Sequence, residues 1–323
     1  MRRLATVAGA GLAAVLIAVM LSNAGTAQAF TAAFFPTQNV GNKGSDVTAI
    51  QYLLQQTGRN VAADGDFGPA TDAAVKSFQS SKGLGADGIV GPLTWGALTP
   101  TLRQGSTGAA VKALQIQLNA KRSAGLAVDG VFGGGTRGAV VAFQQHAGIS
   151  ADGVVGPTTW KNLIWHYQYL FNGSGFCDQD PDGNGPANWG TGAAIGQLEA
   201  GVRLFGTAHG RVPFGDIGFE HGGTIPGHAS HAVGLDADVW PIRTDNAQCT
   251  AGRITWQSST YDRNATRALI KAIRAAAPGH VKLVFFNDPV LISEGLTTHL
   301  DNHDNHFHVR FCERVHPNSL YDC

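Results

Sequence analysis

The stretch "ADGIVGPLTW", residues 86–95, returns as "ADGVVGPTTW", residues 151–160. A second stretch also recurs, since "DGDFGPAT" at 64–71 matches "DGVFGGGT" at 129–136. Self-similarity at a fixed spacing, here about 64 residues, indicates that the first half of the chain contains two copies of one structural unit. The repeat therefore predicts two similar domains, one after the other, in this half of the chain.

Each copy has the pattern of a small helical bundle. The apolar residues that recur at helical spacing near the start of the copies are Val47, Ile50 and Leu54, and Val111, Leu114 and Leu118. Pro69, Pro92 and Pro157 each follow a glycine and suit the first turn of a helix, where no amide hydrogen is needed. We therefore predict two all-α three-helix domains, over residues 37–100 and 101–165, each with its Phe and Trp side chains in a core.

These residues carry a resemblance to a known family. The ordered blocks "LRQGSTGAAVKALQIQL" and "VDGVFGGGTRGAVVAFQQHAGISADGVVGPTTW" resemble the peptidoglycan-binding domain found in many cell-wall hydrolases. The resemblance covers residues 37–165 as two copies and implies that bacterial peptidoglycan is a partner. Because Trp95 and Trp160 recur at helical spacing, we predict core positions for them and assign no glycan contact.

The N-terminus predicts export. Arg2 and Arg3 precede an uncharged stretch from Ala5 to Leu21, and Ala27-Gln28-Ala29 offers a small-x-small cleavage site. This pattern predicts a signal peptide over residues 1–29 and a secreted, cell-wall-associated protein that has no membrane anchor after cleavage. An uncleaved anchor is the alternative, since the uncharged stretch approaches the length of a spanning helix.

The overall composition is that of a globular protein. The 323 residues include 23 acidic and 23 basic side chains, and 43% are hydrophobic. Such a chain suits two or three domains, and its neutral balance argues against a nucleic-acid partner recognised by charge. We expect a monomer.

Four cysteines suit the oxidising compartment that a signal peptide implies. They all lie in the C-terminal half and are Cys177, Cys249, Cys312 and Cys323. No two of them form C-x-x-C, so we expect two disulfides rather than zinc–thiolate ligation. Of the three possible pairings we predict Cys177 with Cys323, which would tie down both ends of the C-terminal domain, and Cys249 with Cys312.

Residues 166–191 are predicted to be a junction. From Asn172 to Gly190 the chain is rich in Gly, Asn, Asp and Pro, which is typical of loops. The stretch "DQDPDG", residues 178–183, matches the opening of a calcium-binding loop, but its twelfth position is Trp189, where an EF-hand needs a glutamate. We therefore predict an Asx-rich turn and no calcium site.

The C-terminal region concentrates histidine, with ten of the 12 histidines after residue 190. Three stand in "DNHDNHFHVRF", residues 301–311, and two more stand with two aspartates in "GHASHAVGLDADVW", residues 227–240. The candidates in these blocks are His228, His231, Asp236, Asp238, His303, His306 and His308. Two imidazoles and one carboxylate around an open position form a common catalytic zinc site. Isolated histidines such as His146 receive no role, and His221 stays unassigned.

Both blocks alternate like strands. "HFHVRF" places His306 and His308 on one face, and "LDADVW" places Asp236 and Asp238 on one face. A His-x-His pair on a strand supplies either two metal ligands or one ligand and a neighbour for metal-bound water. Spacing alone leaves both arrangements open.

The two blocks also carry a second resemblance. The spacing from His231 to Asp238 resembles the H-x-x-G-x-x-x-D signature of the LAS metallopeptidases, named after lysostaphin, D-Ala-D-Ala metallopeptidases and sonic hedgehog. "GHASHAVGLDAD" with the later "HDNHFHVRF" is closer still to the penicillin-insensitive murein endopeptidases. The resemblance covers about residues 200–312 and implies hydrolysis of peptide bonds in peptidoglycan.

The resemblance implies a role for each matching residue. The ligands that it implies for one Zn²⁺ per chain are His231, Asp238 and His308. His306 takes the place of the general base, and His228 and His303 fall on further active-site histidines. Asp236 matches an aspartate that is not a ligand.

The fold class that follows is multidomain, with two all-α three-helix peptidoglycan-binding bundles before an α+β LAS-type metallopeptidase domain over residues 192–323. An antiparallel sheet is expected to carry the ligands. Within this domain "TRALIKAIRAAA", residues 266–277, predicts a helix, and "VKLVFF", residues 281–286, predicts a strand.

The predicted function is that of a murein endopeptidase that cleaves peptide cross-links or stem peptides of the wall. Two weak sites on one insoluble polymer raise the local concentration of the enzyme, whereas a dipeptidase for soluble D-Ala-D-Ala gains nothing from them. A D,D-carboxypeptidase acting on wall stem peptides is one alternative. A catalytically inactive zinc-containing wall-binding protein is another, and the retention of His306 beside His308 argues against it.

Overall fold

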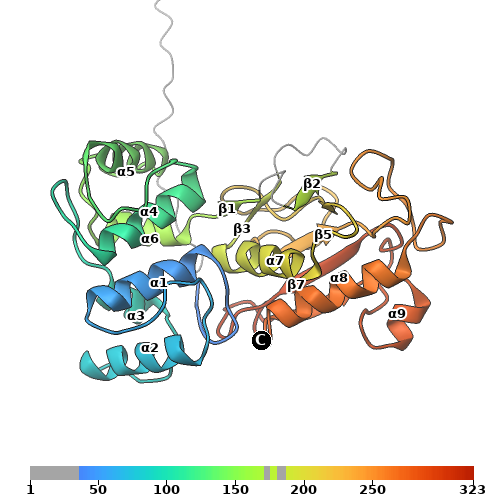
Figure 1. The fold of residues 1–323 in the computed structure, drawn as a ribbon, viewed down its shortest axis with the longest axis horizontal. Coiled ribbons are helices and arrows are strands. Elements are labelled where there is room, and N and C mark those ends of the chain that lie inside the picture. Colours follow the sequence, from blue (N-terminus) through green and yellow to red (C-terminus); the bar gives the residue numbers. More distant parts are fainter. Residues whose placement is uncertain (1–35, 171–174, 180–186) are drawn as a thin grey trace, which may run out of the picture.

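The computed structural model describes residues 36–170, 175–179 and 187–323 (Figure 1). Helices fill one half of the molecule, and a sheet with helices packed on it fills the other. The predicted signal peptide, residues 1–29, and most of the predicted turn at 178–183 lie outside the described residues. Within the described ranges, no helix is both long enough and apolar enough to cross a bilayer.

Each repeat contains three helices, as the sequence pattern predicts. They are α1 (Ser45–Gln56), α2 (Pro69–Ser81) and α3 (Pro92–Leu98) in the first repeat, and α4 (Ala109–Arg122), α5 (Gly134–His146) and α6 (Pro157–Trp165) in the second. Pro69, Pro92 and Pro157 stand in the first turn of α2, α3 and α6, where an amide hydrogen has no partner within the helix.

A buried glutamine holds each Asp-Gly turn of the repeats. The Gln51 Nε2 group donates to Asp64 Oδ1 over 2.8 Å, and Gln51 Oε1 accepts from the amide of Gly65 over 2.9 Å. The same two bonds recur at three more turns, where the glutamine–aspartate pairs are Gln79–Asp87, Gln115–Asp129 and Gln144–Asp152. Since a buried amide must be hydrogen-bonded, these bonds join turn to helix and explain why Gln, Asp and Gly recur.

The two repeats share one hydrophobic core. Helix α1 packs against α4, and a continuous cluster of buried side chains runs from Val47 to Ile164. The sequence predicts a separate core in each bundle, but the apolar faces of α1 and α4 meet and merge the two. Trp95 and Trp160 are each 1% exposed, so the prediction that they are core residues is confirmed.

A five-stranded sheet forms the centre of the C-terminal half, in the order β2–β4–β5–β7–β6. The strands are β2 (Phe176–Asp178), β4 (Val212–Phe214), β5 (Asp236–Val239), β6 (Val281–Phe285) and β7 (Phe307–Phe311). The expected antiparallel pairing holds from β4 to β6, whereas β2 adds a parallel edge beside β4. Strand β2 comes from the predicted junction, residues 166–191, which therefore contributes to the sheet.

Two helices lie against this sheet (Figure 1) and share its core. They are α7 (Gly192–Phe205) and α8 (Arg263–Ala276), which pack against each other. Helix α8 matches the helix predicted over 266–277, and β6 matches the strand predicted over 281–286. The remaining elements are the short helix α9 (Pro289–Ser293) and the paired strands β1 (Gln168–Tyr169) and β3 (Trp189–Gly190).

The disulfides join Cys177 to Cys249 and Cys312 to Cys323, with Cα atoms 5.7 and 5.2 Å apart. The predicted pairing of Cys177 with Cys323 and of Cys249 with Cys312 is therefore wrong. After β7 the chain turns back on itself, and the Cys323 amide donates to the carbonyl oxygen of Glu313. This return brings Cys323 beside Cys312 over a separation of 11 residues, and so short a loop costs little entropy to close.

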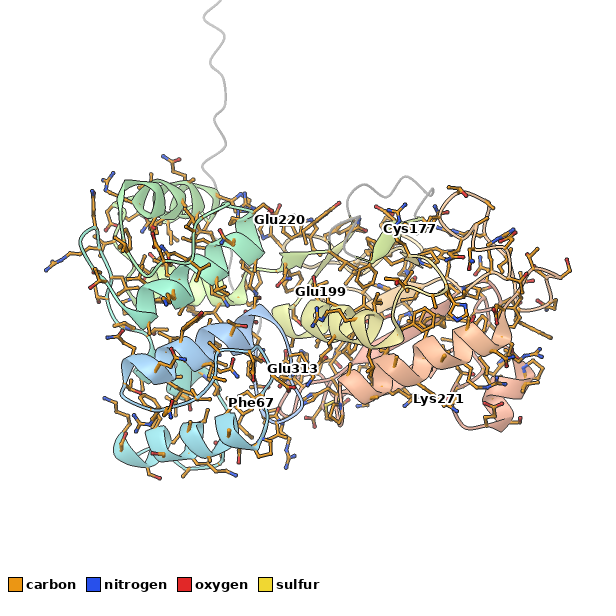
Figure 2. All side chains as sticks on the ribbon, in the orientation of Figure 1. Phe67, Cys177, Glu199, Glu220, Lys271 and Glu313 are labelled. Atoms are coloured by element: carbon orange, nitrogen blue, oxygen red, sulfur yellow. A yellow bond between two sulfur atoms is a disulfide. The ribbon has the colours of Figure 1, made fainter. Side chains whose placement is uncertain are left out.

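The helical half is docked tightly on the C-terminal half. Gly196 of α7 faces the backbone before α1, and a Cβ atom added there would lie 2.5 Å from the carbonyl oxygen of Lys43. The carboxylate of Glu313, at the boundary between the halves (Figure 2), accepts a 3.0 Å hydrogen bond from the amide of Thr37. The repeats and the C-terminal domain therefore share a buried interface.

Replacing Gly196 by Ala tests this interface. The added methyl group meets backbone atoms that cannot move aside, so we expect a loss of roughly 1–3 kcal/mol in the free energy of unfolding. Gly138→Ala is the matched control, since Gly138 is an exposed position in α5 with no atom near its would-be Cβ. That change is expected to stabilise by about 0.5–1 kcal/mol, because Gly costs that much relative to Ala in a helix. Urea unfolding measures both, and an equal effect of the two substitutions would refute a tight contact at Gly196.

The buried carboxyl of Glu313 predicts a dependence of stability on pH. Burial raises the pKa of Glu313 to about 8 from an ordinary value of 4.5, although Thr37 donates to the carboxylate. Between these values the unfolded chain has lost this proton and the folded chain keeps it, so the free energy of unfolding falls as pH rises.

Glu313→Gln is expected to remove this part of the slope between pH 4.5 and about 8. Glu294→Gln is the control, because the pKa of Glu294 is lowered by Arg267 and does not contribute a slope in that window. Urea unfolding at a series of pH values measures the slopes. A Glu313→Gln variant with an unchanged slope contradicts the prediction.

Candidate active site

The pairing of β5 with β7 brings the two histidine-containing blocks together. Their register places Asp236 opposite Arg310 and Asp238 opposite His308. The loops before these strands supply the other histidines. All six predicted site residues line one cleft of about 520 Å³, and they are His228, His231, Asp238, His303, His306 and His308.

Three donor atoms converge at the floor of this cleft. His231 Nε2 lies 3.2 Å from His308 Nδ1 and 3.4 Å from Asp238 Oδ1, and His308 Nδ1 lies 3.0 Å from Asp238 Oδ1. Donors at about 2.0–2.1 Å from a tetrahedral zinc ion stand about 3.3 Å from one another. The three atoms therefore have the spacing of zinc ligands.

The Oδ1 atom of Asp238 provides a second test of this fit. It is buried and accepts no hydrogen bond, although three imidazoles surround it and His306 Nε2 is 3.7 Å away. Burial opposes ionisation of Asp238, but His231, His308 and His306 hold its pKa well below the usual value. An ionised, buried and unsatisfied oxygen is costly unless a cation neutralises it, so these residues fit a zinc ion.

A second set of three donors overlaps the first. His228, His231 and Asp238 also lie close enough to hold a metal ion. However, His228 Nδ1 is 3.8 Å from Asp238 Oδ2, and His228 Nε2 is 2.9 Å from Asp216 Oδ2. The distances among His231, Asp238 and His308 are shorter, and His228 already contacts the carboxylate of Asp216.

Asp236 organises the site without facing the cation position. Its Oδ1 accepts from His308 Nε2 over 2.7 Å and from Arg310 Nε over 2.8 Å. Its Oδ2 accepts from the backbone amide of His231 over 3.0 Å and from the Tyr321 hydroxyl over 2.7 Å. The proton on His308 Nε2 leaves the Nδ1 electron pair directed at the converging donors.

The same contacts set the protonation of His308. Burial lowers the pKa of this imidazole, but its hydrogen bond to Asp236 and the nearby charge of Asp238 outweigh burial and raise the pKa to about 9. A metal ion that binds at Nδ1 must therefore displace a proton at neutral pH.

Local backbone geometry aims His231 into the site. Its φ of 72° is unusual for a residue other than glycine, and it is held there by the bond to Asp236 and by Nδ1, which donates to the Ile217 carbonyl over 3.2 Å. Gly234 also has a positive φ, and a Cβ atom there would lie 2.8 Å from the Tyr167 ring. This close approach explains the glycine between His231 and Asp238.

Two histidines beside the donors have opposite electrostatic environments. Burial lowers the pKa of His306 to about 4, and its Nδ1 atom is 2.8 Å from Asn305 Oδ1. The hydrogen bond to Asp216 raises the pKa of His228. Asp216 was not found by sequence analysis, because a lone aspartate in "FGDIGF" has no pattern and meets His228 only in space.

His303 occupies the rim of the same cleft. Its ring centre is 4.7 Å from that of His306 and 5.7 Å from that of His308. Its Nδ1 atom donates to the carbonyl of Asp301 over 2.9 Å, which leaves Nε2 for the cleft.

A smaller cavity of about 200 Å³ adjoins the cleft. The two cavities share His228, Asp238, Asn302 and His306, and the smaller one continues past Trp240 and Arg253. Space for a ligand therefore continues from the cleft past His306 towards Trp240 and Arg253.

Two families of known proteins match the chain. The family described as a putative peptidoglycan binding domain matches residues 43–98 and 107–163, and the family of penicillin-insensitive murein endopeptidases matches residues 187–283. The second match contains His228, His231 and Asp238 but ends before β7. His303, His306 and His308 therefore lie outside the family match, and it is the fold that places them in the same cleft.

Curated relatives are similar over part of their length. The zinc D-Ala-D-Ala carboxypeptidase of Streptomyces albus G is 36% identical over 99 residues, which are 30% of this chain and 38% of that protein. The N-acetylmuramoyl-L-alanine amidase CwlM of Mycobacterium tuberculosis is 35% identical over 145 residues, which are 40% of this chain and 36% of that protein. The chain thus spans little more than a third of these two relatives.

Among solved structures, a peptidoglycan-binding protein from Clostridioides difficile in complex with glutamine hydroxamate is 47% identical to this chain. The match covers 20% of this chain and 40% of that one, with a TM-score of 0.20.

Asp236→Asn tests the organisation of the donor triangle. An amide cannot accept all four hydrogen bonds, so His308 and His231 lose their fixed orientation, and we expect zinc affinity to fall roughly 10–100-fold. Tyr321→Phe removes only one of the four bonds and is expected to have a smaller effect. Competition titration of the full chain with a chromophoric chelator measures both affinities. An Asp236→Asn chain that binds zinc as tightly as the unchanged protein contradicts this account.

Proposed function

We propose that this chain is a zinc-dependent endopeptidase of the bacterial cell wall, because residues 187–283 match the penicillin-insensitive murein endopeptidase family and follow two matches to the peptidoglycan-binding domain. Its substrates are the peptide cross-links or stem peptides of peptidoglycan. The cleavage-site pattern at the N-terminus supports secretion, and the two repeats support association with the wall.

The observation that carries this proposal is the convergence of His231 Nε2, Asp238 Oδ1 and His308 Nδ1 around an unsatisfied carboxylate oxygen. These three residues would hold one zinc ion. When bound by three protein ligands, zinc keeps a position open for water, lowers the pKa of that water and polarises a peptide carbonyl.

His306 is suited to accept a proton from the attacking water. Its Nδ1 donates to Asn305, which leaves the Nε2 electron pair on the side of Asp238. Burial lowers the pKa of the ring to about 4, so this imidazole is neutral and able to take up a proton at neutral pH.

His228 is suited to the opposite task. Asp216 raises the pKa of His228, so the protonated ring persists at higher pH than an ordinary histidine. From the cleft wall it can donate to the developing charge on the carbonyl oxygen or to the leaving amine. Two imidazoles with pKa values pushed apart provide one base and one acid, and His303 lies beside them as a further donor.

Two features favour an internal peptide bond over a terminal one. The cleft and its adjoining cavity both include His228, Asp238 and His306, so space for peptide continues past the metal position into the second cavity. The wall-binding repeats also suit a polymeric substrate. A D,D-carboxypeptidase on wall stem peptides is the second candidate, and the name of the Streptomyces albus relative favours it.

Product analysis separates these two activities. We expect digestion of purified walls by the full chain to convert cross-linked dimeric muropeptides into monomers, with a chelator abolishing the conversion. Dimers that persist while stem peptides lose one terminal residue would instead establish a carboxypeptidase. Walls left intact by a zinc-loaded chain would establish an inactive binding protein.

Paired substitutions separate metal binding from proton transfer. His308→Ala deletes a proposed ligand, so activity and about one equivalent of bound zinc are expected to disappear together. His306→Ala is expected to keep that zinc and lose roughly 10²–10⁴-fold in turnover, the usual worth of a positioned acid–base group. His209→Ala, outside the cleft, is the control.

Metal content measured beside turnover for the three variants decides the assignment. Loss of zinc from His306→Ala with retention in His308→Ala would invert the assigned roles. Full activity of His306→Ala would move the general base elsewhere, with His303 next in line.

A further inference from the structure

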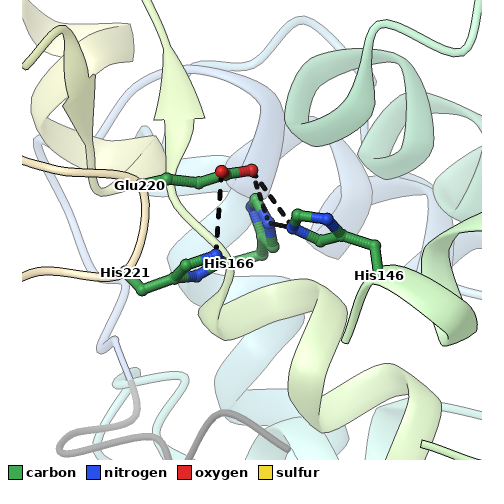
Figure 3. Close-up of side chains that lie close together, drawn as sticks. All are labelled: His146, His166, Glu220 and His221. Carbon is green, nitrogen blue, oxygen red and sulfur yellow. Dashed lines mark hydrogen bonds and ion pairs between the residues drawn. The ribbon is translucent and has the colours of Figure 1, made fainter. Parts of the chain in front are cut away.

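A second cluster of metal-ligating side chains lies between the second repeat and the C-terminal domain (Figure 3). His146 ends α5, His166 follows α6, and Glu220 and His221 come from the loop after β4. One donor atom from each of the four lies within 4.8 Å of all the others. We propose that this cluster is a second zinc site, which ties the wall-binding half of the chain to the catalytic domain.

The hydrogen bonds of the cluster leave electron pairs facing one another. His166, which is 2% exposed, donates from Nδ1 to the Tyr167 carbonyl over 2.7 Å, so its neutral ring carries an electron pair on Nε2. Arg122 Nη1 donates to His146 Nε2 and to Glu220 Oε1, so both of these atoms are acceptors as well. Three acceptors therefore converge, and a cation relieves their repulsion.

The spacing of these acceptors suits zinc. His146 Nε2 is 3.2 Å from His166 Nε2, and Glu220 Oε1 is 3.1 Å from the first and 3.5 Å from the second. A tetrahedral zinc ion sets such donors about 3.3 Å apart. His221 Nε2, at 3.7 Å from the other carboxylate oxygen of Glu220, completes a set of four ligands. The bond from His166 to Tyr167 is the kind of contact that fixes a metal-binding imidazole.

The Arg122–Glu220 ion pair is the competing explanation of the cluster. It satisfies the carboxylate, but it gives no role to three imidazoles gathered around the same point. The Arg122 side chain is 29% exposed, so it can turn towards solvent when zinc takes over the carboxylate.

The ligands are additions to the repeat and are not part of its scaffold. Counting along the matched blocks, the positions of the first repeat that correspond to Arg122, His146 and His166 hold Gly58, Ser81 and Thr101. The first repeat forms the same three helices without these side chains. In the second repeat all three side chains contact Glu220, which points to a role at the interface.

The loop held by this cluster also positions the active site. Four residues before His221, the Ile217 carbonyl accepts from His231, and next to it Asp216 contacts His228. Zinc at the interface would therefore fix this loop to the second repeat and set the orientation of the catalytic domain relative to the wall. The inference stands apart from the proposed function, since none of its four ligands lines the catalytic cleft.

Zinc stoichiometry of the chelator-stripped full chain tests the proposal. After titration with zinc and removal of free metal, we expect two equivalents per chain for the unchanged protein and for His209→Ala. His308→Ala is expected to retain one equivalent, and His308→Ala with His146→Ser is expected to retain none. His146→Ser installs the residue that the first repeat carries at this position. Glu220→Gln, combined with His308→Ala, removes a different ligand and is also expected to leave no bound zinc.

Thermal unfolding in the same backgrounds supplies a second measurement. Added zinc is expected to raise the midpoint of His308→Ala and to leave that of the double variant unchanged. A His308→Ala chain that binds no zinc and gains no stability overturns the proposal. The single variant His146→Ser is expected to bind one equivalent of zinc and to retain its turnover of small muropeptides. That result supports the proposal and leaves the proposed function intact.

Discussion

The antiparallel pairing of β5 with β7 is the constraint on which the active site depends. It sets Asp238 opposite His308, and the two-residue period of a strand puts Asp236 and Asp238 on the same face. A slip by one residue would turn both carboxylates away from the histidines. Asp236 then holds His308, His231 and Tyr321 in place, so that Asp238 Oδ1 is left buried among imidazoles without a hydrogen bond. That oxygen is costly in the bare protein and becomes favourable when a cation binds.

Much of the fold and the candidate ligand blocks could be predicted from the sequence, because each rests on short-range patterns. The repeat recurs because the same glutamine–aspartate–glycine bonds hold each turn. Helix α8 and strand β6 follow from apolar periodicity. The blocks around His231 and His308 could be predicted to form one site because the family resemblance includes both of them, and the structure places them in one cleft.

The remaining features depend on contacts between distant segments. The single core of the two repeats arises from the meeting of α1 and α4, which no local pattern encodes. The predicted disulfide pairing is wrong because the turn after β7 brings Cys323 back to Cys312, which no local pattern indicates. Asp216 and the cluster around Glu220 could not be predicted for the same reason, since their partners come from other loops or from the other half of the chain.

Anomalous diffraction at the zinc edge, from crystals of the zinc-loaded full chain, tests the central claim most directly. The account predicts a peak within about 2.0–2.2 Å of His231 Nε2, Asp238 Oδ1 and His308 Nδ1. A peak in the cleft that is bound by His228 in place of His308, or a cleft with no peak at all, would contradict it.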